Sequence, residues 1–195
     1  MIRFSPPLIK ATLVKRYKRF LADALLEDGT AVTAHCPNTG SMKSCGEPGD
    51  IIFLRPTPEP NKKLKYCWEY TQTAAGLIGI NTMRTNSIVK QALEKKRIKE
   101  LSGYQEVRSE VKFSDKTRFD FLLSNHIDEN PDCFVEVKNV TLFENQIFRF
   151  PDAVTTRGHK HLTELIKAKE SGLSAVLIFL VNRPETATFE CAANV

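Results

Sequence analysis

The chain has 195 residues, of which 42% are hydrophobic and 26% are charged, a balance typical of globular proteins with an apolar core. Its longest strongly apolar run, 175–181, has seven residues, whereas a membrane-spanning helix needs roughly 20, so the composition excludes such a helix. The net charge of +5 comes entirely from residues 1–84, which carry 12 Lys and Arg against 7 Asp and Glu, while residues 85–195 carry 16 of each. This asymmetry indicates a polyanionic partner, or else a mildly basic solvated surface.

The first 80 or so residues predict a β-rich domain. Residues 1–15 contain two prolines and two lysines where a secretory signal needs an apolar stretch, so we expect a cytoplasmic protein. Residues 8–26 alternate apolar and charged side chains, and Asp28-Gly29 is a typical hairpin turn before residues 31–35. Further strand-like segments follow at 49–55, 64–73 and 77–80. About five short strands suit an OB-fold barrel, with an SH3-like barrel as the alternative.

Basic side chains lie among aromatic ones in this first region, as in grooves that track a nucleic-acid backbone and stack its bases. The aromatic residues are Tyr17, Phe20, Tyr66 and Trp68. The candidate DNA-binding residues are Lys15, Arg16, Lys18, Arg19, Lys63 and Lys65. Ordinary outward-facing strand charges with inward-facing aromatic side chains are the alternative interpretation.

From about residue 81 the apolar period changes to that of a helix, which we expect to begin at Asn81, Thr85 or Asn86 and to end at Gly103. Strands are predicted at 105–113, 118–124 and 134–138, a second helix at 155–171, and a fully buried strand at 175–181. The order αβββαβ implies a mixed sheet covered by helices. We therefore predict an α+β protein of two domains, 1–84 and 85–195.

Five cysteines are an odd number, and none forms a C-x-x-C pair, which argues against a disulfide framework and against structural zinc. We expect reduced and mostly packed thiols. Only His159 and His161 lie close together among the histidines, and on a helix residues two apart face about 200° away from each other. A zinc site is therefore not expected.

Two carboxylates and a lysine on the predicted second and third strands of the sheet form a candidate catalytic site. Because strand side chains alternate, Glu136 and Lys138 face the same side, and Asp120 can add a carboxylate from the neighbouring strand. Two carboxylates suit Mg²⁺, with Mn²⁺ as a substitute, and a lysine beside them suits phosphodiester hydrolysis. Glu110 is an additional acid candidate. The alternative is a surface ion pair on a strand, which is worth little by itself.

The start of the second predicted helix offers two more candidate DNA-binding residues, Arg157 and Lys160, because a helix N-terminus favours anions. The same segment also reads as a packing helix with a polar rim. His159 and His161 are interpreted as surface or cap-bonded residues and are not included among the catalytic candidates.

Four longer segments carry a family resemblance: Cys36–Met42, Arg118–Leu123, Glu136–Leu142 and Phe150–Leu162. With the D…E-x-K pattern, the chain resembles the PD-(D/E)XK nuclease superfamily and, more specifically, the sugar fermentation stimulation protein A family. The resemblance implies an N-terminal OB-fold domain, a PD-(D/E)XK nuclease-like domain, non-specific DNA binding and a regulatory role in maltose and other sugar metabolism. It also implies that Asp120 and Glu136 hold the metal and that Lys138 is catalytic.

The chain departs from the family pattern in a few places. Thr117 stands where a Ser is usual, and Lys63 stands where an Arg is usual, which loses bidentate phosphate geometry. Relatives usually continue past the position of Val195, so we expect a shortened or unusual C-terminus. We predict a DNA-binding protein, with an active Mg²⁺-dependent endonuclease as the alternative and a binding module that keeps nuclease geometry for its shape alone as a third possibility. Asp120, Glu136 and Lys138 are all intact, so the sequence does not separate the first two functions.

Overall fold

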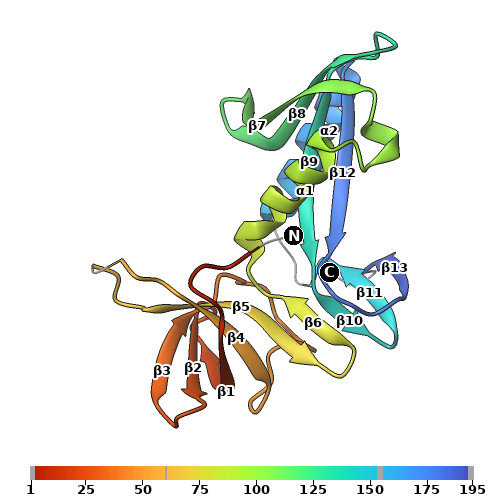
Figure 1. Cartoon of the computed structure of the whole chain (residues 1–195). Helices are drawn as coiled ribbons and strands as arrows, with labels where there is room; N and C mark the ends of the chain where they lie inside the picture. The colour runs from red at the N-terminus through yellow and green to blue at the C-terminus, as the bar shows by residue number, and fades with distance from the viewer. Residues whose placement is uncertain (1–2, 60, 153–155, 193–195) are drawn as a thin grey trace. The chain divides into compact units, whose positions relative to one another are not determined.

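A computed structural model describes residues 3–59, 61–152 and 156–192 (Figure 1). Its contacts divide the chain into two compact units. Unit 1 comprises residues 1–82, 140–153 and 181–195, and unit 2 comprises residues 83–139 and 154–180. The chain therefore leaves the first unit and returns to it twice. None of the helices in the described residues is long and apolar enough to cross a membrane.

The first unit begins with a closed barrel, shown in red to yellow in Figure 1. Its strands are β1 (Ile9–Tyr17), β2 (Leu21–Leu26), β3 (Ala31–His35), β4 (Ile51–Pro56), β5 (Tyr66–Thr73) and β6 (Gly76–Gly79). The order is β3-β2-β1-β4-β5-β6, and a parallel pairing of β3 with β5 closes five of the strands into a ring. The predicted OB-fold barrel is thereby confirmed, and the SH3-like alternative is not needed.

The single alternating run predicted at 8–26 is two strands in the structure. Lys18 and Arg19 have φ values of 50° and 66°, so the chain turns sharply in the left-handed region between β1 and β2. Trp68, which the sequence placed in a base-stacking groove, is fully buried in the barrel core with Leu13, Ile52 and Leu54. The bulk of its indole ring packs among apolar side chains, so it stabilises the barrel and offers no stacking surface.

Three short strands complete the first unit, and the sequence predicted none of them. They are β10 (Leu142–Glu144), β11 (Ile147–Phe150) and β13 (Thr188–Cys191), in the order β10-β11-β13. β10 and β11 form a hairpin, while β13 pairs with β11 in parallel. Four of the five cysteines are buried and Cys191 is exposed, which confirms the expectation of mostly packed thiols.

The second unit contains a four-stranded sheet and two main helices. In chain order its elements are the 3-10 helix η1 (Thr82–Arg84), α1 (Thr85–Glu94), the 3-10 helix η2 (Lys99–Leu101), β7 (Tyr104–Ser114), β8 (Thr117–His126), β9 (Cys133–Val140), α2 (Thr156–Glu170) and β12 (Ser174–Val181). The sheet order is β12-β9-β8-β7, and β7, β8 and β9 are successively antiparallel. The backbone N–H of Ser174 donates to Asp132 and that of Asn182 to Val140, a constant offset that makes β12 parallel to β9. The predicted mixed sheet in the order αβββαβ is confirmed.

Two apolar clusters lie on the sheet, one involving α1 and the other α2. Val89 and Leu93 of α1 pack with Phe121 and Val135. The cluster on the other face contains residues of α2, β8 and β9: Phe119, Leu122, Phe134, Leu165 and Ala168. The alternating side chains of β9 thus separate an α1 face from an α2 face.

The strand predicted to be fully buried, β12, is partly exposed at every one of its residues. In the described part of the chain it lies at the edge of the sheet, where its one neighbour is β9. The uninterrupted apolar run therefore predicted a strand correctly but overestimated its burial. The burial of an edge strand depends on what covers the open edge of the sheet.

Candidate active site

Strands β8 and β9 bring the three predicted catalytic residues close together. Phe121 pairs with Val135 in the antiparallel ladder, so Asp120 and Glu136 occupy the next position along the two strands. The backbone N–H of Val137 donates to Asp120 Oδ2 at 2.7 Å. Lys138 lies two residues beyond Glu136, on the same side of β9, as alternation predicts.

Asp120 is held by donors from two elements. Besides the Val137 N–H, the Asn86 side chain in the first turn of α1 donates to Asp120 Oδ1 at 2.7 Å. Burial raises the pKa of Asp120 above its usual range, the negative charge of Glu136 adds to the rise, and the two donors oppose it. The sequence had suggested Asn86 as a helix cap. Its contact with Asp120 spans 34 positions of the chain, so no local pattern could reveal it.

Glu136 is an almost fully buried carboxylate, with a side chain only 4% exposed. Lys138 Nζ lies 2.6 Å from Glu136 Oε1, and His161 Nδ1 of α2 forms a short hydrogen bond with the same oxygen. The second oxygen, Oε2, is buried and has no hydrogen-bond partner among the described residues. Both neighbours thus engage one oxygen of Glu136 and leave the other available.

His161 is a site residue that the sequence interpretation set aside. It is 9% exposed and joins α2 to β9 through Glu136. Its position within the segment Phe150–Leu162 was a signal, because that segment contributes to the family resemblance. The interpretation as a surface or cap-bonded histidine is wrong, since the ring is buried against a carboxylate.

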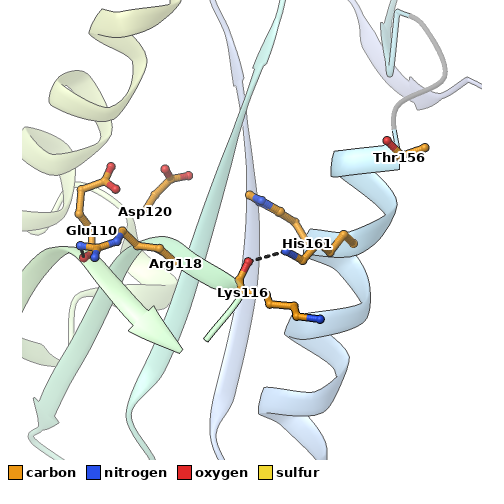
Figure 2. A pocket seen from close by; sticks show the side chains of 7 residues that line it. Glu110, Lys116, Arg118, Asp120, Thr156 and His161 are labelled. Atoms are coloured by element: carbon orange, nitrogen blue, oxygen red, sulfur yellow. Dashed lines mark hydrogen bonds between the residues drawn. The ribbon is translucent and has the colours of Figure 1, made fainter. Parts of the chain in front are cut away.

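A pocket of about 640 Å³ opens beside Asp120 (Figure 2). Its walls come from β7, the β7–β8 turn, β8 and α2. The lining residues are Glu110, Lys116, Arg118, Asp120, Thr156, Lys160 and His161. Glu110, the additional acid candidate, therefore lies at the same pocket as Asp120, and the buried Glu136 is joined to it through His161.

The predicted DNA-binding residues of the barrel differ in how free their charges are. Lys15, Lys18, Arg19 and Lys63 are exposed, although Lys15 also pairs with Asp23 at 3.6 Å. Lys65 is exposed as well, and its Nζ lies 3.4 Å from the carbonyl of Glu59. For all of these residues, contact with DNA remains a prediction.

The Arg16 side chain forms hydrogen bonds within the barrel. Its Nη2 donates to the carbonyl oxygens of Arg19, Asn38 and Gly40 at 2.8–2.9 Å, which ties the loop after β3 to β1. In unit 2, Lys160 lines the pocket. Arg157 lies in α2, and its side chain is outside the described part of the structure.

The residues present fit a divalent cation with few protein ligands. No group of three or more His, Cys, Asp and Glu side chains is gathered for metal binding in the described residues. Asp120 and Glu136 offer two carboxylates, and the unpartnered Glu136 Oε2 is a buried oxygen that a hard cation would satisfy. Mg²⁺ is commonly held in this way, by one or two carboxylates with waters and substrate phosphate oxygens.

Comparisons with known proteins agree with both halves of the chain. Residues 14–80 match the model of the SfsA N-terminal OB domain, and residues 83–195 match that of the Sugar fermentation stimulation protein RE domain. The chain is also similar to a solved structure of SfsA from Pyrococcus furiosus in complex with Ca²⁺. The two are 25% identical with a TM-score of 0.83, over 95% of this chain and 77% of the relative.

Proposed function

Because the chain belongs to the sugar fermentation stimulation protein family, we propose that it binds DNA without sequence preference and hydrolyses its phosphodiester bonds with a divalent cation. The observation that carries the proposal is the arrangement of Asp120, which lines the pocket, beside Glu136 and Lys138 of the neighbouring strand, with Glu136 Oε2 unpartnered among the described residues. A carboxylate pair beside a lysine is suited to phosphoryl chemistry at a metal.

Asp120 and Glu136 are the residues that would hold the cation. The relative from Pyrococcus furiosus was solved in complex with Ca²⁺, which takes the same oxygen ligands as Mg²⁺ with looser geometry. When bound, such a cation neutralises phosphate charge and supplies a nucleophilic water at neutral pH. Mg²⁺ is the proposed cofactor, and Mn²⁺ is its substitute.

The remaining roles belong to the chain itself. His161 and Lys138 hold Glu136 by Oε1, so the carboxylate keeps one orientation. Lys138 is 16% exposed at its side chain, which leaves room for its ammonium group to contact a phosphate oxygen of the substrate. A charge placed there before substrate arrives stabilises the developing negative charge without reorganisation.

The barrel is the proposed DNA-holding part. Its exposed Lys18, Arg19 and Lys63 lie in the half of the chain that carries the whole net positive charge, and OB-fold barrels commonly bind nucleic-acid strands. The part in maltose and other sugar metabolism that the resemblance implies stays a prediction.

The test is incubation of the full chain with plasmid DNA in Mg²⁺, in Mn²⁺ and in EDTA. We expect nicked and linear products only with metal. Glu136→Gln should abolish cleavage and also the rise in melting temperature that metal gives the wild type. Lys138→Met should abolish cleavage but keep that rise, because lysine is not a metal ligand.

Two outcomes would contradict the proposal. A wild-type chain whose melting temperature ignores both metals and that leaves plasmid intact has no working metal site. A Lys138→Met chain that cleaves as fast as wild type would show that the lysine takes no part in the chemistry.

A further inference from the structure

The pocket beside Asp120 carries more positive charge than the proposed metal site uses. Three of its seven lining residues, Lys116, Arg118 and Lys160, are cations, and none of them belongs to the Asp120, Glu136 and Lys138 group. They come from separate places in unit 2: Lys116 from the β7–β8 turn, Arg118 from β8, and Lys160 from α2. Their meeting at one pocket is therefore a property of the fold and not of a local charge run.

Backbone oxygens hold two of these cations. Arg118 Nη1 donates to the carbonyl of Glu110 at 2.7 Å. Lys160 Nζ donates to the carbonyl of Lys116, shown by the dashed line in Figure 2. A carbonyl oxygen orients such a group without neutralising it, so each keeps its full charge and further N–H donors.

Carboxylates do not neutralise this charge. Among the described residues, none of the three cations forms an ion pair with Asp or Glu. Elsewhere in the same unit exposed lysines do pair, for example Lys112 with Asp115 at 2.7 Å. In Figure 2 the two carboxylates of the pocket, Glu110 and Asp120, lie on the same side as Arg118, while Lys116 and His161 lie on the other.

Spacing along β8 relates these charges to the proposed chemistry. Arg118 and Asp120 both line the pocket and are two residues apart on the strand, so their Cα atoms lie about 6.8 Å apart at the usual rise of an antiparallel strand. A strand of DNA with one phosphate at Asp120 thus has room to place the neighbouring phosphate against the cations. Three charges around one concave site also concentrate the field that a polyanion feels.

We propose that Lys116, Arg118 and Lys160 form a phosphate-binding subsite that holds the DNA backbone next to the phosphodiester being cleaved. This subsite would position the substrate for the proposed hydrolysis, so the inference rests on the proposed function. Of its residues, only Lys160 was a candidate from the sequence. Lys116 and Arg118 are assigned by the pocket.

The experiment measures binding of a short fluorescein-labelled DNA duplex to the full chain by anisotropy, in EDTA to prevent cleavage, over a series of NaCl concentrations. The slope of log affinity against log salt should become less steep by about 0.9 for each cation changed to Gln, because each lost phosphate contact releases fewer counterions. The triple variant Lys116→Gln, Arg118→Gln, Lys160→Gln should thus lose about 2.7 of the slope.

A matched control changes Lys95, Arg97 and Lys99 to Gln. These residues are exposed in the same unit and do not line the pocket, so the slope should stay as in wild type. A charge-conserving variant, Lys116→Arg, Arg118→Lys, Lys160→Arg, should also keep the wild-type slope. Single variants give the same measurement one charge at a time if the triple variant does not fold.

An unchanged slope in the folded Gln variants would overturn the subsite, and so would an equal loss in the control. A wild-type chain that binds no duplex would overturn it as well. A wild-type chain that binds DNA but never cleaves it, while the pocket variants lose slope and the control does not, would overturn the proposed hydrolysis alone and leave the subsite standing.

Discussion

Asp120 is a partly buried acid whose hydrogen bonds only partly offset its loss of water. Burial raises its pKa above the ordinary value of 3.8, and the nearby Glu136 raises it further. The folded chain therefore keeps this proton to a higher pH than the unfolded chain does. By linkage, the free energy of unfolding falls as the pH rises from 3.8 through the folded-state pKa. The ionised acid thus destabilises the metal-free protein at neutral pH.

We expect Asp120→Asn to raise the free energy of unfolding at neutral pH, because the amide has no charge to desolvate. Asn86 can turn its own amide to keep a hydrogen bond with the new side chain. Urea unfolding in EDTA at neutral and at acidic pH measures the gain, which should shrink as the pH falls toward 3.8. The same gain at both pH values, or a loss at neutral pH, would contradict this explanation.

The site residues show what a sequence pattern can and cannot predict. That Glu136 and Lys138 lie side by side was predictable because alternation along a strand decides which side chains share a face. Asn86 and His161 were not, because their contacts join residues 34 and 25 positions apart and depend on how α1 and α2 pack on the sheet. The subsite cations Lys116 and Arg118 were missed for the same reason.

At the scale of elements, Arg16 links strand β1 to the loop that follows β3. Its Nη2 donates to three carbonyl oxygens within 2.9 Å, two of them in that loop. We expect Arg16→Gln to lower the free energy of unfolding by about 2 kcal/mol, because partly buried carbonyls lose charged donors. Chemical denaturation measures the loss.

Arg19→Gln is the matched control for this change. Arg19 is exposed in the adjacent turn. It accepts the hydrogen bond from Arg16 with its backbone carbonyl and not with its side chain, so the loss in the free energy of unfolding should stay within about 0.5 kcal/mol. Equal losses in the two variants would mean that Arg16 contributes no more than an ordinary surface charge.

Element prediction succeeded where the pattern was long and failed where it was short. The barrel, the sheet and the helix α2 were predicted close to their observed bounds, whereas α1 ends at Glu94 and not at the predicted Gly103. The strands β10, β11 and β13 were missed because each has only three or four residues, too few to show a period. Residues 8–26 were read as one run because positive φ values at Lys18 and Arg19 leave no clear mark on alternation.

At the scale of the whole molecule, the thiols report on the integrity of both units. Cys36, Cys45, Cys67 and Cys133 are buried and Cys191 is exposed. Burial raises the pKa of Cys45 to about 12 and that of Cys133 to about 11, and the thiolate is the reactive form. We expect a thiol reagent to modify one cysteine quickly in the native protein and all five after denaturation.

Mass spectrometry after a short pulse of iodoacetamide identifies the modified residue. Cys191→Ser is the control, and it should leave the native chain almost unreactive. Rapid modification of Cys45 or Cys133 in the native chain would mean that the barrel or the sheet opens far more readily than its packing implies.

Because the chain returns twice to the first unit, that unit can be completed only after the second unit has been synthesised. Asp152 accepts the backbone N–H of Ser41 at 2.7 Å, and Arg183 donates to Ser44 and to the carbonyl of Thr141. The parallel pairing of β11 with β13 can form only after α2 and β12 have been synthesised, because β13 follows them in the chain. The barrel can close early in synthesis, but the unit that begins first is the one completed last. Residues 1–84, cut out by themselves, would form a barrel whose loops lack the partners that hold them in the full chain.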